Sequence, residues 1–261
     1  MGPAAKQGET MDETVCTIRF PSGAVGVASG DRETFLARRV ASVGASEIAM
    51  ALQASKYGDL RDLVLRKRGD APKTEESDHM QDGRDLEDGV LRIGMRRLAR
   101  EYFHRSIPRV AQQIHVTDPQ CSRLSATPDA VLVDEQGTAI GVVETKVDRS
   151  GADWREVDER GFAHLEPGDL RLSYFLQVQA QLACTGCSVG YLVVWTGYDV
   201  TTIRIHADAY LHNVMRGAAK SVFAWVECGS LPPATNRTTE ETLRATLRQR
   251  AERTDEAPAN V

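Results

Sequence analysis

The sequence predicts one α/β domain in which a central mixed β-sheet is flanked by helices. The chain has 261 residues, and single α/β domains often exceed 200 residues, so one domain with short appendages is the simplest division. Hydrophobic residues make up 41% and charged residues 26% of the chain, which is the composition of an ordinary soluble globular protein. Helical patterns fill the first part of the chain, and strand patterns then alternate with helices.

Both ends of the chain lack the pattern of a packed domain. Residues 1–29 are rich in Gly, Ala, Ser and Thr without sustained periodicity, and residues 232–261 begin with two prolines and are charged and poor in aromatics. We therefore expect a flexible N-terminal segment and a flexible C-terminal tail. The folded domain is predicted to occupy residues 30–231.

Four helices are expected in the first part of the domain. Asp31 can cap a helix that runs through Arg39, and Gly44 marks a turn before the next helix. The polar composition of residues 69–83 is that of a loop. The remaining three helices are predicted at 46–54, 60–68 and 85–103, the last of them long and amphipathic.

Strands dominate the second part. Residues 130–133 end in the turn Asp134-Glu135-Gln136-Gly137, so residues 139–147 are predicted to return as the partner strand of a hairpin. A charged loop is expected over residues 149–169. The other predicted elements are strands at 114–116, 189–195 and 200–205 and helices at 172–184 and 208–227.

Charge, hydropathy and cysteine usage limit the classes of function. The formal net charge of −5 argues against a protein that coats nucleic acid through bulk basicity. No window of about 18 uncharged apolar residues exists, which excludes a membrane span. The N-terminus has no apolar signal region, and Lys6 stands where a myristoylation signal needs Ser or Thr. The five cysteines do not form a disulfide framework, so we expect a cytoplasmic protein.

Two local patterns have more than one explanation. Between Gly89 and His115 there is an excess of five positive charges, which is either a patch for nucleic acid or a solvated helix face. Cys184 and Cys187 have the spacing of metal ligands but lack a second pair, so small core residues are the better interpretation. The charges in the first pattern are Glu101 and the arginines Arg92, Arg96, Arg97, Arg100, Arg105 and Arg109.

The predicted hairpin carries residues suited to metal chemistry. Asp129 precedes its first strand, and the turn folds Asp129 back towards Glu144. Glu144 and Lys146 lie two apart and share one face of the second strand, with Thr145 turned away. Two carboxylates beside a lysine suit a divalent metal that activates water, and the lysine would stabilise negative charge on a phosphate. An exposed hairpin with ordinary charges is the alternative explanation.

Glu87 heads an otherwise apolar stripe on the long helix. The stripe continues with Leu91, Gly94 and Leu98. The carboxylate is either a first-turn acid stabilised by the helix N-terminus, or, because a buried carboxylate needs a partner, an acid that shares a metal with Asp129.

A polar face also runs along the helix predicted at 172–184. Tyr174, Gln177 and Gln181 occupy positions i, i+3 and i+7, while Phe175 and Val178 belong to the packed side together with Leu182. These glutamines are either surface residues or a row of neutral donors beside the metal.

In order and spacing, these motifs resemble the lambda-exonuclease, or YqaJ-like viral recombinase, family of PD-(D/E)xK nucleases. The resemblance covers about residues 32–205. It implies a restriction-endonuclease-like core and processive, metal-dependent digestion of one strand of linear duplex DNA from 5′ to 3′, which leaves a 3′ overhang for a strand-annealing partner. The matching blocks are Val43-Gly44-Ala45-Ser46-Glu47-Ile48, Gly83-x-x-x-Glu87, Ala126-Thr127-Pro128-Asp129-Ala130, Val143-Glu144-Thr145-Lys146 and Gln177-Val178-Gln179-Ala180-Gln181.

The resemblance also implies roles for individual residues, a cofactor and an assembly. The catalytic set is Asp129, Glu144, Lys146 and Glu87, and the metal set is Asp129, Glu144, Glu87 and Thr145. A pocket for the terminal 5′-phosphate is implied at Arg39, Ser46, Thr127, Gln177 and Tyr174. Ligands that offer only oxygen favour Mg²⁺ or Mn²⁺. The assembly implied is a homotrimeric ring that threads DNA.

Two rival classes remain open. A PD-(D/E)xK endonuclease of defence or restriction type would share the hairpin but needs no pocket for a strand end, and it would cut covalently closed circular DNA. A non-catalytic DNA-binding or structural protein on the same scaffold is disfavoured by the intact set of Asp129, Glu144 and Lys146.

Overall fold

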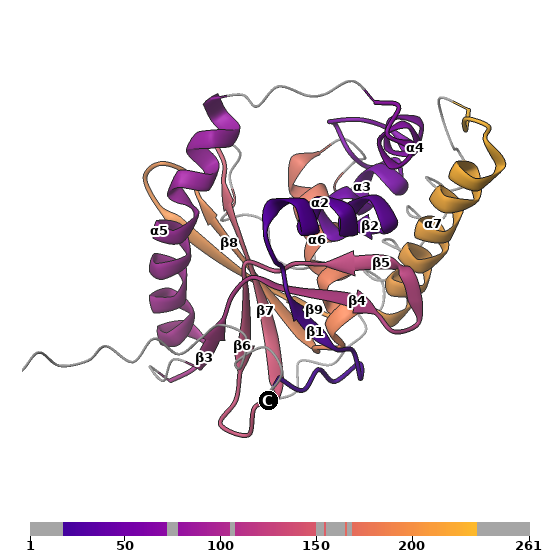
Figure 1. The fold of residues 1–261 in the computed structure, drawn as a ribbon. Coiled ribbons are helices and arrows are strands. Elements are labelled where there is room, and N and C mark those ends of the chain that lie inside the picture. The colour runs from indigo at the N-terminus through magenta and orange to yellow at the C-terminus, as the bar shows by residue number, and fades with distance from the viewer. Residues whose placement is uncertain are drawn as a thin grey trace, which may run out of the picture.

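The computed structural model describes residues 18–71, 78–104, 108–149, 154, 165 and 169–233. Within these residues two mixed β-sheets are packed with helices, as Figure 1 shows. One sheet has the strand order β1-β4-β5-β2 and the other β3-β6-β7-β8-β9. The predicted class, α/β with mixed pairing and flanking helices, is confirmed, but the strands form two sheets instead of one central sheet.

Each sheet combines strands from separate parts of the chain. The four-stranded sheet contains β1 (Gly26–Ala28), β2 (Val43–Gly44), β4 (Ile114–Asp118) and β5 (Cys121–Ala126). The five-stranded sheet contains β3 (Arg109–Ala111), β6 (Ala130–Val133), β7 (Ala139–Val147), β8 (Val189–Trp195) and β9 (Val200–His206). The helices are α2 (Arg32–Ala41), the 3-10 helix η1 (Ala45–Glu47), α3 (Ile48–Ala51), α4 (Leu60–Arg68), α5 (Asp78–Glu101), α6 (Leu170–Thr185) and α7 (Ala209–Cys228).

The centre of the five-stranded sheet is a hairpin followed by a parallel crossover. Strands β6 and β7 pair antiparallel, as predicted, and β7 pairs parallel with β8. Parallel neighbours need a long connection, which here carries α6. Val142 packs into the larger hydrophobic core together with α6, whereas its neighbour Val143 packs into a second core together with α5. Helices α5 and α6 therefore cover opposite faces of this sheet.

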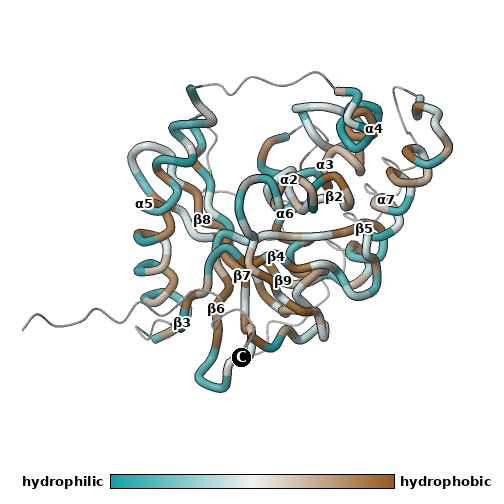
Figure 2. Tube along the Cα trace, viewed as in Figure 1, coloured by the Kyte–Doolittle hydropathy of each residue, from teal (hydrophilic) through white to brown (hydrophobic). Residues whose placement is uncertain are grey.

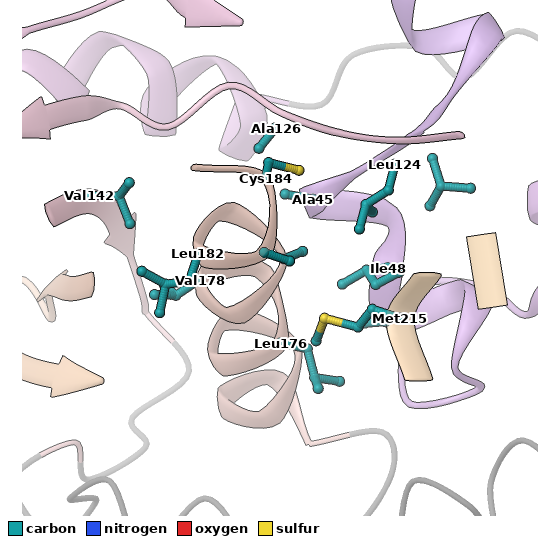
Figure 3. Packing of buried hydrophobic residues seen from close by; sticks show 14 of the residues in the cluster. Ala45, Ile48, Leu124, Ala126, Val142, Leu176, Val178, Leu182, Cys184 and Met215 are labelled. Atoms are coloured by element: carbon teal, nitrogen blue, oxygen red, sulfur yellow. The ribbon is translucent and has the colours of Figure 1, made fainter. Parts of the chain in front are cut away.

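Helix α6 is the centre of the larger core. Figure 3 shows its buried side chains on two sides of the helix: Val178 and Leu182 lie towards Val142 of β7, whereas Leu176 lies towards Met215 of α7. Cys184 and Cys187 are both buried in this core, which confirms their interpretation as core residues. Apolar residues dominate β6 and β8 (Figure 2), as expected for strands that are covered on both faces.

Gly94 lets helix α5 approach the sheet closely. A Cβ atom at this position would lie 2.5 Å from Cγ1 of Val193, far inside van der Waals contact. The same stripe of α5 buries Leu91 and Leu98, as its periodicity predicts. The glycine therefore sets how near Glu87, two turns earlier on the helix, comes to strands β6 and β7.

Several predicted boundaries were wrong. Helix α5 begins at Asp78, so the second part of the loop predicted at 69–83 is helical. The helix predicted at 46–54 is a 3-10 turn followed by the short α3, and Gln53 ends it with a φ of 57°. Strands β3 and β5 were not predicted.

The segment 18–29 does not fit the expectation of a flexible N-terminus. Ile18 and Phe20 are buried, and the backbone N–H of Ser22 donates to the carbonyl oxygen of Thr185 at 3.1 Å. Strand β1 then pairs with β4. Gly186, with a φ of 73°, leaves room for this contact, because a Cβ there would lie 2.3 Å from the Ser22 nitrogen. We call residues 18–28 the N-terminal strap.

Other predictions lie outside the described residues. These are the flexible segment up to residue 17, nearly all of the loop predicted at 149–169, the tail from residue 234 onwards, and Arg105. Among the helices that are described, none has the length and apolar character needed to cross a membrane.

Candidate active site

The β6–β7 hairpin brings Asp129 beside the second strand. Ala130 pairs with Val143, so Asp129 lies next to Glu144 and Thr145. The backbone N–H and the hydroxyl of Thr145 both donate to Oδ2 of Asp129 at 2.6 Å. Thr145 lies on the face of β7 opposite Glu144 and Lys146, as predicted, and its side chain reaches across the hairpin to the Asp129 carboxylate.

Glu144 is the most deeply buried acid of the site, with 2% of its surface exposed. Its Oε1 accepts hydrogen bonds from Nζ of Lys146 and Nε2 of Gln177, and its Oε2 accepts one from Nε2 of Gln181 at 2.5 Å. Burial and the neighbouring Asp129 raise the pKa of Glu144 to about 7, although Lys146 opposes the shift. The predicted row of neutral donors on α6 thus faces this carboxylate.

Glu87 adds a third carboxyl group from α5. It is half-buried and interacts by hydrogen bonding with Asp129, and burial together with the charge of Asp129 raises its pKa to about 7. Three acids therefore converge, Glu87 from α5, Glu144 from β7 and Asp129 from the residue before β6. Within the described part of the chain, no three His, Cys, Asp or Glu side chains form a ready-made metal cluster. The donor set nevertheless fits a hard divalent cation, which would relieve the repulsion among these oxygen ligands.

Lys146 is held between an acid and an aromatic ring. Its Nζ bonds Glu144 and lies 5.3 Å from the ring centroid of Tyr174. The Tyr174 ring stacks on Trp154 at 5.9 Å, and Nε1 of Trp154 donates to Oδ2 of Asp148 at 2.5 Å. Glu144 and Asp129 raise the pKa of Lys146 above its ordinary value against the opposing effect of burial, so the site retains an ammonium group.

A cavity of about 590 Å³ opens beside these residues. Glu87, Thr145 and Lys146 line it from the side of the five-stranded sheet and α5. A smaller cavity of about 70 Å³ adjoins it, lined in part by Thr127 and His115. Of the five residues predicted to hold a 5′-phosphate, four line the larger cavity, namely Arg39, Ser46, Tyr174 and Gln177. Arg39, Ser46 and Gln177 also line the smaller one.

Arg39 has acidic and basic neighbours that sequence reasoning missed. Glu47 accepts from Arg39 at 3.1 Å and from Lys67 at 2.6 Å. The signal for Lys67 was present, because it continues the apolar stripe of Leu60, Leu63 and Val64 on α4. A lysine on such a stripe needs a buried partner.

His115 is another residue that the sequence did not single out. Its Nδ1 lies 3.1 Å from Oγ1 of Thr127. Burial and the nearby Arg38 lower the pKa of His115, which favours a neutral imidazole. This ring holds the Thr127 hydroxyl at the wall of the smaller cavity.

The arginine cluster of α5 does not line either cavity. Arg92, Arg96 and Arg100 are exposed, while Arg97 pairs with Asp199, which directly precedes β9. These side chains therefore belong to a solvated helix face within the single chain.

Comparisons with known proteins agree with this architecture. The model of the YqaJ-like viral recombinase domain matches residues 34–188. Among solved structures, the alkaline exonuclease LHK-Exo from Laribacter hongkongensis is similar with a TM-score of 0.54 and 19% identity, covering 84% of this chain and 98% of that chain. Its complex with dAMP gives a TM-score of 0.55 at 19% identity, covering 85% and 99%. A search of curated proteins finds no match.

The two kinds of comparison carry different weight. At 19% identity, the likeness to LHK-Exo shows a shared fold. The family model covers more than half of the chain, and its span contains the acids, Lys146 and the four cavity-lining residues of the predicted phosphate pocket. The chain therefore belongs to the family of YqaJ-like viral recombinase domains.

Proposed function

We propose that this protein is a metal-dependent exonuclease that digests one strand of linear duplex DNA from 5′ to 3′ and leaves a 3′ overhang for a strand-annealing partner. One observation carries the proposal. A single cavity of about 590 Å³ is lined both by Glu87 and Lys146 and by Arg39 and Ser46. A phosphate to be cleaved and the phosphate of a strand end can therefore occupy neighbouring positions.

The carboxylates of Glu87, Asp129 and Glu144 would hold Mg²⁺ or Mn²⁺, with Thr145 beside them. When bound, such a cation supplies an activated water and stabilises the charge that develops on the scissile phosphate. Gln177 and Gln181 orient Glu144 through their amide N–H groups. Lys146 places a positive charge next to the same carboxylate and into the cavity, where it stabilises the phosphate as negative charge accumulates.

The polarity of digestion would come from the end pocket. The guanidinium of Arg39 offers a planar fork of donors, which suits the oxygens of a terminal phosphate. Ser46, Thr127 and Gln177 add neutral donors around it, and Tyr174 lines the larger cavity and contacts Lys146 through its ring. Such a pocket reads the end of a strand and not its bases. The description of LHK-Exo as an alkaline exonuclease, and its complex with dAMP, support an exonuclease in preference to an endonuclease.

Digestion of end-labelled duplexes tests the proposal. Linear duplex with a 5′-phosphate should be degraded much faster than the same duplex with a 5′-hydroxyl, and the label on the 3′ end should remain on single-stranded DNA. Arg39→Ala should remove most of the difference in digestion rate between the 5′-phosphorylated and the 5′-hydroxyl duplex. Arg204→Ala, which removes an exposed arginine of β9, is the matched control and should keep it. Cleavage of covalently closed circles, or digestion from the 3′ end, would instead identify the rival endonuclease or the opposite polarity.

The proposal includes an assembly that encloses DNA. A chain with a net charge of −5 cannot remain on long DNA by electrostatic adhesion alone, because such binding weakens steeply with salt. We expect the homotrimeric ring of the family, acting in the cytoplasm, with part of the exposed set Arg92, Arg96 and Arg100 facing its channel. Light scattering checks the assembly, and a strictly monomeric species that still digests DNA processively would contradict it.

A further inference from the structure

Arg39 is one member of a group of three charges, two of which are buried. The side chain of Arg39 is 38% exposed, whereas the side chains of Glu47 and Lys67 are 8% and 2% exposed. Arg39 also lines both cavities. The group therefore presents one cation to the cavity and keeps the other two charges behind it.

The contacts of Arg39 fix the guanidinium from several sides. Oε1 of Glu47 accepts from Nη2 of Arg39 at 3.1 Å, and the guanidinium carbon lies 5.7 Å from the ring centroid of Phe35. Lys67 donates to the backbone carbonyl oxygen of Arg39, which ties the end of α2 to α4. Glu47 is itself anchored, because Oε2 accepts from the backbone N–H of Gly44 at 2.9 Å. The arginine is therefore oriented before any ligand arrives.

The three charges of the group add up to one positive charge. A carboxylate paired with Arg39 alone would cancel the cation that a phosphate needs. Nζ of Lys67 reaches Oε2 of Glu47 at 2.6 Å and compensates that carboxylate from the buried side. Although burial favours protonation of Glu47, Lys67 and Arg39 hold its pKa below the ordinary value, so it stays ionised. One net positive charge remains, at the exposed member of the group.

We infer that Glu47 is a positioning residue that orients the Arg39 guanidinium towards a terminal phosphate monoester, and that Lys67 balances Glu47 so that the charge of Arg39 remains available to this phosphate. The inference rests on the proposed exonuclease function and names two residues through which its end selectivity would arise. A purely structural role, in which the three charges only join α2 to α4, is the alternative.

Glu47→Gln separates positioning from charge. The substitution removes a negative charge, so the positive charge around Arg39 cannot fall, and charge alone predicts equal or tighter binding of a phosphate. Positioning predicts the opposite, because the guanidinium loses its ionic anchor. We expect the ratio of kcat/KM for 5′-phosphorylated over 5′-hydroxyl duplex to fall about tenfold or more, through a higher KM for the phosphorylated end.

Lys67→Met tests the balancing role. It leaves Glu47 buried with Arg39 as its one remaining cationic partner within the part of the chain that the structure describes, so the pair becomes neutral and phosphate selectivity should again fall. A buried carboxylate that loses one of its two cationic partners is costly and threatens folding. The double variant Glu47→Gln/Lys67→Met removes both buried charges, leaves Arg39 charged, and should fold; it should remain poorly selective because the anchor is absent.

Asp118→Asn is the matched control. Asp118 forms a buried ion pair with Arg216 at 2.6 Å between β4 and α7, and it does not line either cavity. Its loss should lower stability while the preference for 5′-phosphate stays as in wild type.

The experiment measures kcat/KM for both ends in wild type and in the four variants, beside thermal unfolding. Selectivity that falls in Glu47→Gln but not in Asp118→Asn supports positioning. Equal loss of activity on both ends, or selectivity unchanged or raised in Glu47→Gln, overturns it. A wild type that does not prefer the phosphorylated end, or does not digest linear duplex, overturns the proposed function itself and is recognised before any variant is compared.

Discussion

Replacing Glu144 by glutamine should stabilise the metal-free protein while abolishing its activity. The pKa of Glu144 is raised from 4.5 to about 7, first by burial and then by the charge of Asp129. The folded state therefore holds this proton to a higher pH than the unfolded state. Because the folded state binds this proton more tightly, the free energy of unfolding falls as the pH rises from 4.5 through 7. Above that range Glu144 no longer makes it depend on pH.

The size of the effect follows from the two pKa values. Linkage gives a destabilisation by the ionised Glu144 of about 3 kcal/mol at pH 8 and about 1 kcal/mol at pH 5. Glutamine has the same shape and no charge, so Glu144→Gln should recover this free energy. Its amide can also be accommodated, because Oε1 of Gln181 is buried with no hydrogen-bond partner among the described residues and becomes an acceptor when the Gln181 amide turns over.

Urea denaturation in the presence of EDTA, followed by circular dichroism at pH 5 and pH 8, measures the change. We expect the variant to be more stable than wild type at both pH values, with the larger gain at pH 8. Glu135→Gln, a substitution at an exposed position of the β6–β7 turn, is the control and should show no such pH dependence. A variant that is no more stable than wild type at pH 8, or whose gain is the same at both pH values, would refute the reasoning. Added Mg²⁺ should stabilise wild type more than the variant and so narrow the difference.

Three further outcomes are expected. Asp129→Asn should lose cleavage in Mg²⁺ while keeping its fold by circular dichroism, and near-normal digestion would remove Asp129 from the metal site. Lys146→Ala should slow single-turnover cleavage by about 10²-fold or more, since one preorganised stabiliser of developing charge is lost; a change within a few-fold would leave Lys146 without a catalytic role. Gly94→Ala should lower the free energy of unfolding by about 1–3 kcal/mol in urea titrations, because its Cβ would meet Val193 at 2.5 Å, whereas Gly89→Ala, where a Cβ meets nothing within 4 Å, should not.

The parts of the fold with strong periodicity were predictable from the sequence. Helix α4 begins and ends at the predicted residues, and the β6–β7 hairpin has the predicted partner strands. Strand β5 was not predictable in the same way. Its sequence contains no β-branched or aromatic residue, and it becomes a strand because its neighbours β4 and β2 pair with it on both sides.

The candidate site likewise contains residues that local sequence patterns predict and contacts that they do not predict. Asp129, Glu144 and Lys146 are local in sequence, so the period of two and the turn bring them together. The pairing of Glu47 with Lys67 joins residues 20 apart on different helices, and the contact of His115 with Thr127 depends on how β4 meets the residues after β5. Such contacts depend on tertiary packing, and no local pattern encodes them.

The N-terminal strap has a consequence for synthesis of the chain. Ser22 donates through its hydroxyl to the carbonyl oxygen of Cys184 at 2.8 Å, a contact between residues 162 apart. At about 5–20 residues per second, a ribosome adds the intervening chain in roughly 10–30 s. During this time Ile18 and Phe20, which are buried in the finished protein, have no complete core to enter. The first described residues of this protein are thus among the last to find their places, and a nascent chain that pauses before α6 is complete exposes them for longer.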